Sequence, residues 1–231
     1  MIALDHIAIW SNNLFDTTYR ISQGTGIGNC DGGFFPGLGF GQKVISLGGD
    51  VYIEVESMAD HQQVLDRSRT SIEMERQIAH GDCFAAWCLR SDDIGEMNAF
   101  SRHFGKPLTE GIPGGKFRMS GESSAKTRHI PVFWESWFIG MPNIYYVPDL
   151  SSHSSRLPPQ EGTGKVVAQG VTAIEIGGSE DDLKRWLGDV CDPRQFSFDI
   201  GYNNKDHGLY EVFFDTDDGP KSIRLNPVVS R

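Results

Sequence analysis

The chain has 231 residues, of which 39% are hydrophobic and 11% aromatic, enough to bury the core of one large domain or two smaller ones. Its formal net charge is −10 with no cluster of Lys and Arg, so neither a nucleic acid nor an anionic membrane is expected as a partner. The four cysteines form no CxxC pair, and no apolar run reaches the ~18 residues that span a bilayer, which predicts a cytoplasmic protein with reduced thiols.

A strand, a helix and a hairpin are predicted in the first part of the chain. LDHIAIW alternates as a half-buried strand does, with Leu4 and His6 on one face and Asp5 on the other. Asn12 or Asn13 is placed to cap the helix that follows. After the glycine-rich loop GTGIGNCDGGFFPGLGFG, the runs QKVISLG and VYIEVES are joined by Gly-Gly-Asp, which is typical of a β-hairpin.

The same order of elements returns twice. CFAAWCLR predicts a strand, and Asp92 and Asp93 cap the helix IGEMNAFSRHFG, which ends at Gly105. KFRMSG, HIPVFWESWF and NIYYVPD follow as strands. GVTAIEIGG then opens a third copy, in which Ser179 and Asp182 start a short helix.

The predicted fold class is therefore α+β, with repeated βαβββ modules that form curved mixed sheets around a cavity. We place paired modules in residues 1–150, the first in 1–60 and the second in 83–150, and a third unit in 165–231, packed on the same fold. HQQVLDRSRTSIEMERQIAHGD is predicted to be a helical connector between the first two modules.

The glycine-rich loop does not predict a phosphate site. It lacks GxGxxG and GxxxxGK[ST], and it precedes a strand where a phosphate loop would precede a helix. We expect it to form a rim over the cavity, with Phe35 as an apolar ligand contact. Gln42, at the start of the next strand, is a candidate hydrogen-bonding group for the ligand.

Three segments in this order resemble the glyoxalase-like proteins of the vicinal oxygen chelate superfamily: LDHIAIWSNNL, GGFFPGLGFGQKVISLGGDVYIEVES and FAAWCLRSDDI. In that superfamily, paired βαβββ modules curve into an open barrel. A His on the first strand and a Glu on the last strand of each module commonly hold a metal. The resemblance implies that His6 and Glu54 are such a pair, as metal ligands and catalytic groups, with Fe, Mn, Ni or Zn as the metal.

The second module departs from the family pattern. Ala86 stands where the second His is expected, and Tyr145 or Tyr146 stands near the place of the second Glu. Only half of the four-ligand set is present. A divalent metal is therefore expected to be weakly bound or absent.

Each candidate also has a purely structural interpretation. His6 is either a site residue or a buried histidine bonded to a backbone carbonyl. Glu54 and Glu56 share a strand face, which is either a solvated row or a cavity wall suited to acid–base work. The aromatic run HIPVFWESWFIGMPNIYYVP is either core or an aromatic cavity wall, with Trp134 and Tyr145 as ligand contacts.

Two functions stay open. One is a metal-dependent lyase, isomerase or dioxygenase that acts on a small oxygenated metabolite, and the other is a metal-free ligand-binding or sequestering protein of the resistance type. The partner is a small molecule in both cases, and a homodimer is left open as the assembly. In either case we predict that His6 and Glu54 face each other across neighbouring strands at the polar floor of the cavity.

Overall fold

The structure is a computed structural model of the chain and describes residues 2–35, 39–60, 69–110, 117–118, 121–122, 128–129, 139–147 and 164–228. The described part contains helices and mixed sheets that are open at their edges, so the predicted α+β class is confirmed. The segments 36–38, 61–68 and 148–163 lie outside it, as does most of 111–138.

The first module contains β1 (Ala3–Ser11), α1 (Leu14–Thr25), β2 (Cys30–Phe35), β3 (Phe40–Gly48) and β4 (Val51–Met58). β1 pairs with β4 in parallel, while the β4–β3 and β3–β2 pairs are antiparallel, which confirms the predicted hairpin. The expectation of a long glycine-rich loop before β3 was wrong, because β2 lies inside it. The register between β2 and β3 shifts between Asp31 and Gly33, so β2 contains a β-bulge at Gly32.

The second module repeats this pairing. It contains β5 (Cys83–Ser91), α4 (Ile94–Phe104), β6 (Thr109–Glu110), β9 (Arg128–His129) and β10 (Asn143–Tyr146). β5 and β10 are parallel, and the β10–β9 and β9–β6 pairs are antiparallel. Since β1 and β5 also pair antiparallel, an approximate two-fold axis between them relates the two modules. Of the predicted strand HIPVFWESWF, only its first residue, in β9, lies within the described residues.

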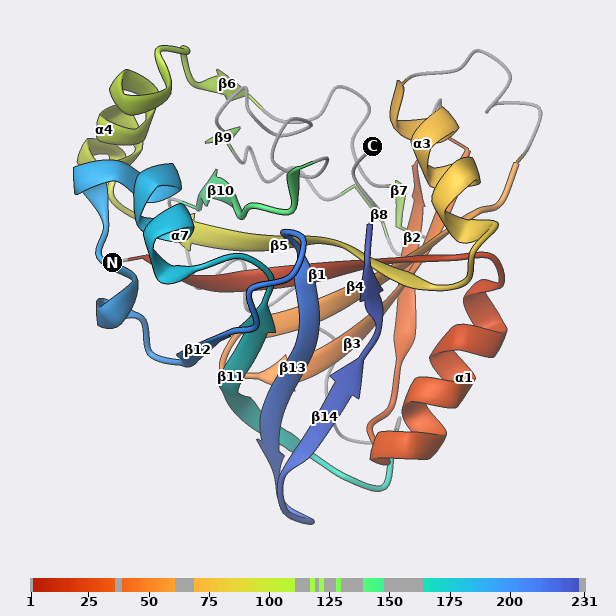
Figure 1. Cartoon of the computed structure of the whole chain (residues 1–231). Coiled ribbons are helices and arrows are strands. Elements are labelled where there is room, and N and C mark those ends of the chain that lie inside the picture. Colours follow the sequence, from red (N-terminus) through yellow and green to blue (C-terminus); the bar gives the residue numbers. More distant parts are fainter. Residues whose placement is uncertain are drawn as a thin grey trace.

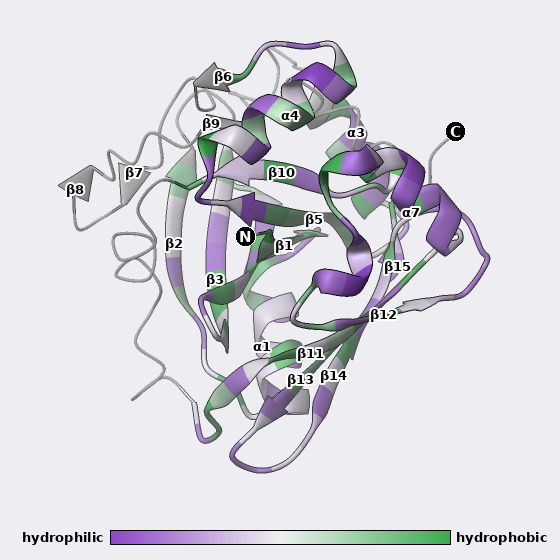
Figure 2. Ribbon diagram, turned by 90° about the vertical axis from the view of Figure 1, so that its left-hand side faces the viewer, coloured by the Kyte–Doolittle hydropathy of each residue, from purple (hydrophilic) through white to green (hydrophobic). Residues whose placement is uncertain are grey.

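One large sheet joins both modules in the described residues. Its order is β6-β9-β10-β5-β1-β4-β3-β2-β7-β8, where β7 (Phe117–Arg118) and β8 (Gly121–Glu122) form a short hairpin beside β2. Figure 2 shows this sheet curving from β2 and β3 towards β10. The connector between the modules contains α3 (Arg69–Ile78), within the predicted helical segment.

The C-terminal elements include a second sheet, which packs against the large one (Figure 1). They are β11 (Ala168–Ile176), α7 (Glu180–Leu187), two 3-10 turns (Gly188–Val190 and Pro193–Gln195), β12 (Asp199–Tyr202), β13 (Leu209–Thr216) and β14 (Lys221–Arg224). The sheet order is β12-β11-β13-β14, so this unit shares the element order of the modules but not their pairing. β15 (Asn226–Pro227) returns to pair with β5. The division of the chain into three units remains a prediction.

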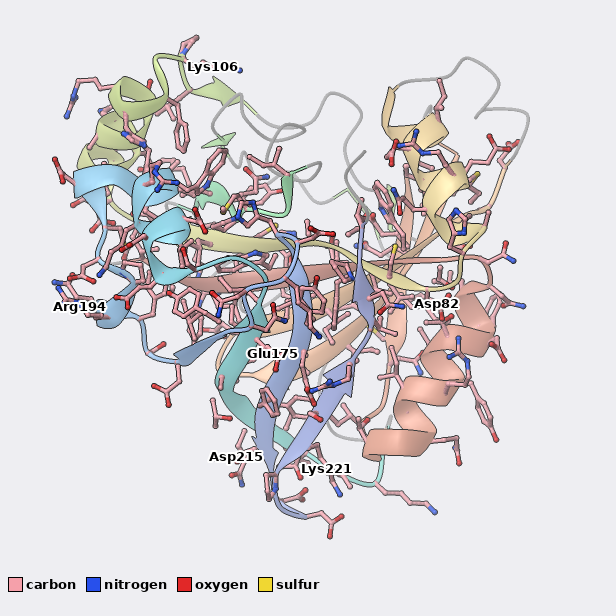
Figure 3. The ribbon with its side chains drawn as sticks, in the orientation of Figure 1. Asp82, Lys106, Glu175, Arg194, Asp215 and Lys221 are labelled. Carbon is pink, nitrogen blue, oxygen red and sulfur yellow. The ribbon has the colours of Figure 1, made fainter. Side chains whose placement is uncertain are left out.

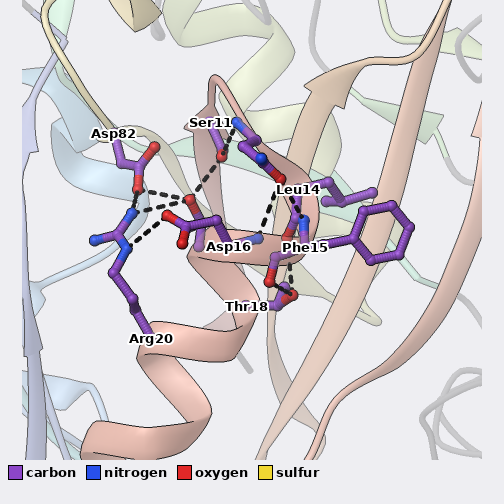
Figure 4. Close-up of polar contacts among 9 residues, drawn as sticks. Ser11, Leu14, Phe15, Asp16, Thr18, Arg20 and Asp82 are labelled. Atoms are coloured by element: carbon purple, nitrogen blue, oxygen red, sulfur yellow. Dashed lines mark hydrogen bonds and ion pairs between the residues drawn. The ribbon is translucent and has the colours of Figure 1, made fainter.

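Both modules start their helix in the same way. Ser11 Oγ accepts the backbone N–H of Asn13 at 3.0 Å, and Ser91 Oγ accepts that of Asp93 at 3.0 Å. Asn13 and Asp93 are the caps, which confirms the predicted start of each helix. Figure 4 shows the first of these starts, where the Thr17 hydroxyl also donates to Asp82.

Candidate functional site

The two faces of the large sheet differ in chemistry. One face packs Ile7, Ile9 and Ile53 against apolar residues of the second sheet such as Val212 and Phe214. The opposite face, which we call the site face, carries polar side chains from five adjacent strands. They are Asp5, His6, Gln42, Tyr52, Glu54, Glu56, Cys88, Arg90, Asn143 and Tyr145.

A β-bulge in β1 places two consecutive residues on the site face. The register between β1 and β5 shifts between Leu4 and His6, so Asp5 is the extra residue. Leu4 therefore lies in the apolar cluster with Ile7, whereas Asp5 Oδ2 lies 2.6 Å from His6 Nδ1. The prediction that Leu4 shares a face with His6 and that Asp5 takes the other was wrong, because strict alternation does not survive a bulge.

His6 is enclosed by charged and aromatic groups. Its ring stacks on Tyr52 at a centroid distance of 5.2 Å and meets Tyr145 at 5.3 Å. Burial acts to lower the pKa of His6, but its interactions with Cys88 and Glu54 and the hydrogen bond with Asp5 act to raise it. The pKa ends well above its usual value. His6 is thus held in a fixed orientation and favours its protonated form.

Arg90 supports this arrangement from β5. Its Nη1 donates to the backbone carbonyl of Asp50 at 2.9 Å and lies 3.5 Å from Asp5 Oδ1. Asp5 is therefore positioned between two groups of opposite charge, Arg90 and His6. Since all three side chains are buried, this polar cluster is compensated internally.

Glu54, Glu56 and Gln42 form the part of the site face on β4 and β3. Glu54 is the register partner of Ala8, so it shares the face with His6 but lies two residues further along the strand, while Tyr52 stands opposite His6. Glu56 accepts a hydrogen bond from Trp10 Nε1 at 3.2 Å and is the register partner of Gln42. All three predicted site residues are buried.

Gln42 stands out because its side-chain amide is only 2% exposed and has no hydrogen-bond partner on either polar atom within the described residues. It packs closely against Gly32 of β2, where an added Cβ would lie 2.7 Å from Gln42 Oε1. A buried amide with neither its donor nor its acceptor satisfied is costly in a folded protein.

Asn143 is a second buried amide with an unpaired group. Its Oδ1 accepts the backbone N–H of Ile144 at 2.9 Å, while Nδ2 has no partner within the described residues. Asn143 is the register partner of Cys88 on β5, as Glu54 is of Ala8 on β1. The expectation that Tyr145 or Tyr146 stands near the place of the second Glu is thereby corrected, since Asn143 takes that place.

Cys88 and Tyr145 complete the centre of the site face. Cys88 is the register partner of His6, and burial raises the pKa of its thiol. Burial and the charges of Cys88 and Glu54 raise the pKa of Tyr145 well above its usual value. Both groups therefore favour their neutral, hydrogen-bond-donating forms.

Not every predicted site residue can be placed. Phe35 ends β2, but its side chain lies outside the described residues, as does the whole of Trp134. Glu175 lies on β11 in the second sheet (Figure 3), where Asn203 Nδ2 donates to its side chain at 3.0 Å. It is not part of the site face.

The described residues contain no group of three or more His, Cys, Asp or Glu side chains arranged to hold a metal ion. His6 Nδ1 is occupied by Asp5, and the register places Ala86 and Asn143 at the two-fold equivalents of His6 and Glu54. An alanine has no donor atom, and an amide is a weak ligand for the transition metals that imidazole and carboxylate bind. The residues present do not fit the family's four-ligand metal site.

Sequence reasoning missed Asp5, Arg90 and Asn143. The signal for Arg90 was available, since a charged residue in the apolar strand CFAAWCLR needs a buried partner. No spacing in the sequence aligns Asn143 with Glu54, because that match depends on the pairing of β10 with β5. No local sequence signal marks the bulge at Asp5.

Comparisons with known proteins agree with this fold. The family model described as a glyoxalase-like domain matches residues 4–191. A search of curated proteins found no match. Among solved structures, a hypothetical protein from Staphylococcus aureus matches with a TM-score of 0.62 and 12% identity, over 90% of this chain and 88% of that one. A methylmalonyl-CoA epimerase from Mycobacterium tuberculosis matches with a TM-score of 0.44 and 14% identity, over 65% of this chain and 91% of that one.

The paired βαβββ modules, with their polar site face, define a small-molecule-binding protein of the vicinal oxygen chelate fold. Within that class, the chain belongs to the glyoxalase-like domain family, whose model spans most of its length. The resemblance seen in the sequence is confirmed. No helix among the described residues is both long and apolar enough to cross a membrane.

Proposed function

We propose that the chain binds a small oxygenated organic molecule on the site face by hydrogen bonds, without a resident metal ion. The observation that supports this most strongly is the Gln42 amide, buried on the site face with both polar atoms unpaired within the described residues. Leaving such a group unsatisfied costs about 1–3 kcal/mol. A ligand with an acceptor and a donor would recover that free energy, which is a reason for a binding protein to keep the residue.

The character of the site face also favours a polar ligand of modest size. Three carboxylates, Asp5, Glu54 and Glu56, are balanced in part by His6 and Arg90, so the face offers both acceptors and donors. The sequence is acidic and contains no cluster of Lys and Arg that would attract a polyanion. A small molecule with hydroxyl and carbonyl groups fits this set.

The failure of the residues to fit a four-ligand metal site supports the metal-free alternative among the two functions that the sequence left open. The catalytic reaction that these groups suit is a proton transfer at the carbon next to a carbonyl, with Glu54 and His6 as the acid–base groups. A cytoplasmic location and a homodimer remain predictions.

The experiment is a comparison of two buried glutamines. Gln42→Leu removes the unpaired amide and keeps the volume, so the ligand-free protein is expected to gain about 1–2 kcal/mol in free energy of unfolding while losing ligand binding. Gln77→Leu is the matched control: Gln77 is also buried, but its Nε2 donates to Glu73 Oε1 at 2.6 Å. That variant is expected to lose stability.

Urea unfolding measures both variants, and ligand-observed NMR with a panel of hydroxy acids, keto acids and hydroxyketones measures binding. A Gln42→Leu protein that is less stable than wild type would show that Gln42 has a structural partner. A Gln42→Leu protein that binds the same compounds equally well would remove the amide from the site. Either result overturns the proposal.

A further inference from the structure

The two modules place different chemistry at equivalent positions. β4 pairs with β1 as β10 pairs with β5, and β1 and β5 meet antiparallel at the centre (Figure 1). Glu54 stands opposite Ala8, and Asn143 stands opposite Cys88. Counting from Ser11 and Ser91, which start the two helices alike, makes Ala8 and Cys88 equivalent. Glu54 and Asn143 therefore occupy equivalent positions in the two modules.

Glu54 and Asn143 differ in the kind of hydrogen bond that each can make with a ligand. A carboxylate such as that of Glu54 only accepts hydrogen bonds when it is ionised. Asn143 has its acceptor Oδ1 committed to the backbone N–H of Ile144, which fixes the orientation of the amide and leaves Nδ2 to donate. This donor is fully buried and has no partner within the described residues. The site face thus presents an acceptor in one module and a donor in the other.

The sheet sets the separation between them. β4, β1, β5 and β10 are consecutive strands about 4.8 Å apart, and Glu54 and Asn143 are offset by two residues along them, so their backbones lie about 16 Å apart on the sheet. Both side chains extend from the same face of the sheet, so a ligand that contacts both has to span the distance left between their ends.

We propose that Asn143 Nδ2 donates to a carbonyl oxygen of the ligand and that Glu54 accepts from a hydroxyl of the same molecule, which makes the ligand a hydroxy-carbonyl compound. This inference rests on the proposed function and narrows its ligand class. It differs from recognition of a simple carboxylate, because a carboxylate offers no hydroxyl hydrogen to Glu54. It also gives Asn143 a role at the place where a second carboxylate would otherwise sit.

The probes are three hydroxyketones of increasing spacing, hydroxyacetone, 4-hydroxy-2-butanone and 5-hydroxy-2-pentanone, with their methyl ethers as controls. Saturation-transfer NMR on the full chain measures their affinity. We expect at least one hydroxyketone to bind and its methyl ether to bind about tenfold more weakly, since the ether has no hydrogen to give to Glu54. Equal binding of the ether overturns the proposal.

The variant is Asn143→Asp, which keeps Oδ1 and exchanges the donor for an acceptor. It is expected to weaken hydroxyketone binding about tenfold or more, because the carbonyl oxygen of the ligand then faces an acceptor oxygen of Asp in place of the Nδ2 donor. Asn203→Asp is the matched control, since Asn203 donates to Glu175 on the second sheet, and it is expected to bind within about twofold of wild type. Undiminished binding by Asn143→Asp overturns the proposal.

Asn143→Ala repeats the test without placing a charge in a buried position, and thermal melts followed by circular dichroism establish that each variant is folded. Compounds that bind in a Gln42-dependent way but lack either the hydroxyl or the carbonyl, with no hydroxyketone bound, would overturn this inference and leave the proposed function standing. The stability gain of Gln42→Leu needs no ligand, so its absence reports on the proposed function alone.

Discussion

Asp5 Oδ2 lies 2.6 Å from Nδ1 of His6, its neighbour in the sequence, although side chains of consecutive strand residues normally point to opposite faces. The bulge in β1 is what brings them together. Arg90, on the adjacent strand, lies against the other oxygen of Asp5. Asp5 thus fixes the orientation of His6, and its hydrogen bond adds to the effects of Cys88 and Glu54 that raise the pKa of His6.

The titration of His6 tests this relationship. Asp5→Asn removes the carboxylate that holds Nδ1, so the pKa of His6 is expected to fall towards its ordinary value of about 6.5. Histidine-selective NMR over a pH series measures the midpoint in both proteins. An unchanged midpoint would contradict the assigned pairing.

The same shift makes stability depend on pH. Because the folded-state pKa of His6 is raised, its charge stabilises the folded protein in full below about pH 6.5, and this contribution is lost as the pH rises through the folded-state pKa. The difference in free energy of unfolding between wild type and His6→Gln is therefore expected to shrink with rising pH. Urea titrations at several pH values measure it, and a difference that grows would reverse the assigned sign.

Arg90→Gln is expected to lower the free energy of unfolding by about 3 kcal/mol, because it leaves the buried carboxylate of Asp5 without its cation and removes a donor from the Asp50 carbonyl. Arg20→Gln is the control. Arg20 contacts Asp16 and Asp82 but is 55% exposed, so its loss should cost less than about 1 kcal/mol. Equal losses in the two variants would show that the Arg90–Asp5 contact contributes little.

Gly32→Ala tests how Gln42 is positioned. The new methyl group would lie 2.7 Å from Gln42 Oε1 and 2.9 Å from Val44 Cγ2, so a loss of about 1–3 kcal/mol is expected. In a Gln42→Ala background part of the clash disappears, and the cost of Gly32→Ala should be smaller. A double-mutant cycle measures this coupling, and strict additivity would rule out the close contact.

Metal content tests the ligand set. Purified wild type is expected to hold well under one equivalent of divalent metal, and EDTA should leave its melting temperature unchanged. Ala86→His combined with Asn143→Glu supplies the two missing ligands at the two-fold equivalents of His6 and Glu54, so this double variant is expected to bind Zn²⁺ in calorimetry. One tightly bound equivalent in wild type, lost in both His6→Ala and Glu54→Ala, would show that the metal-free assignment is wrong.

Local patterns in the sequence were enough to identify the helix starts and the β3–β4 hairpin, although they missed β2 in the glycine-rich segment. Asn13, Asp93 and the Ser179–Asp182 capping box begin helices where predicted, because a cap depends on residues within one turn. The hairpin of β3 and β4 follows from a short turn between alternating runs. His6 and Glu54 share a face, because parity along regular strands is also a local property, but Tyr52 and not Glu54 stands directly opposite His6.

Only the tertiary structure decided which residues meet. The bulge at Asp5 depends on the register between β1 and β5, whose paired residues are far apart in the sequence, and it reversed the expected faces of Leu4 and Asp5. The match of Asn143 with Glu54 depends on the pairing of β10 with β5, which sequence spacing across a long connection does not determine. The unpaired amide of Gln42 is visible only once every neighbour is in place, since hydrogen-bond satisfaction is a property of three-dimensional packing and not of local sequence.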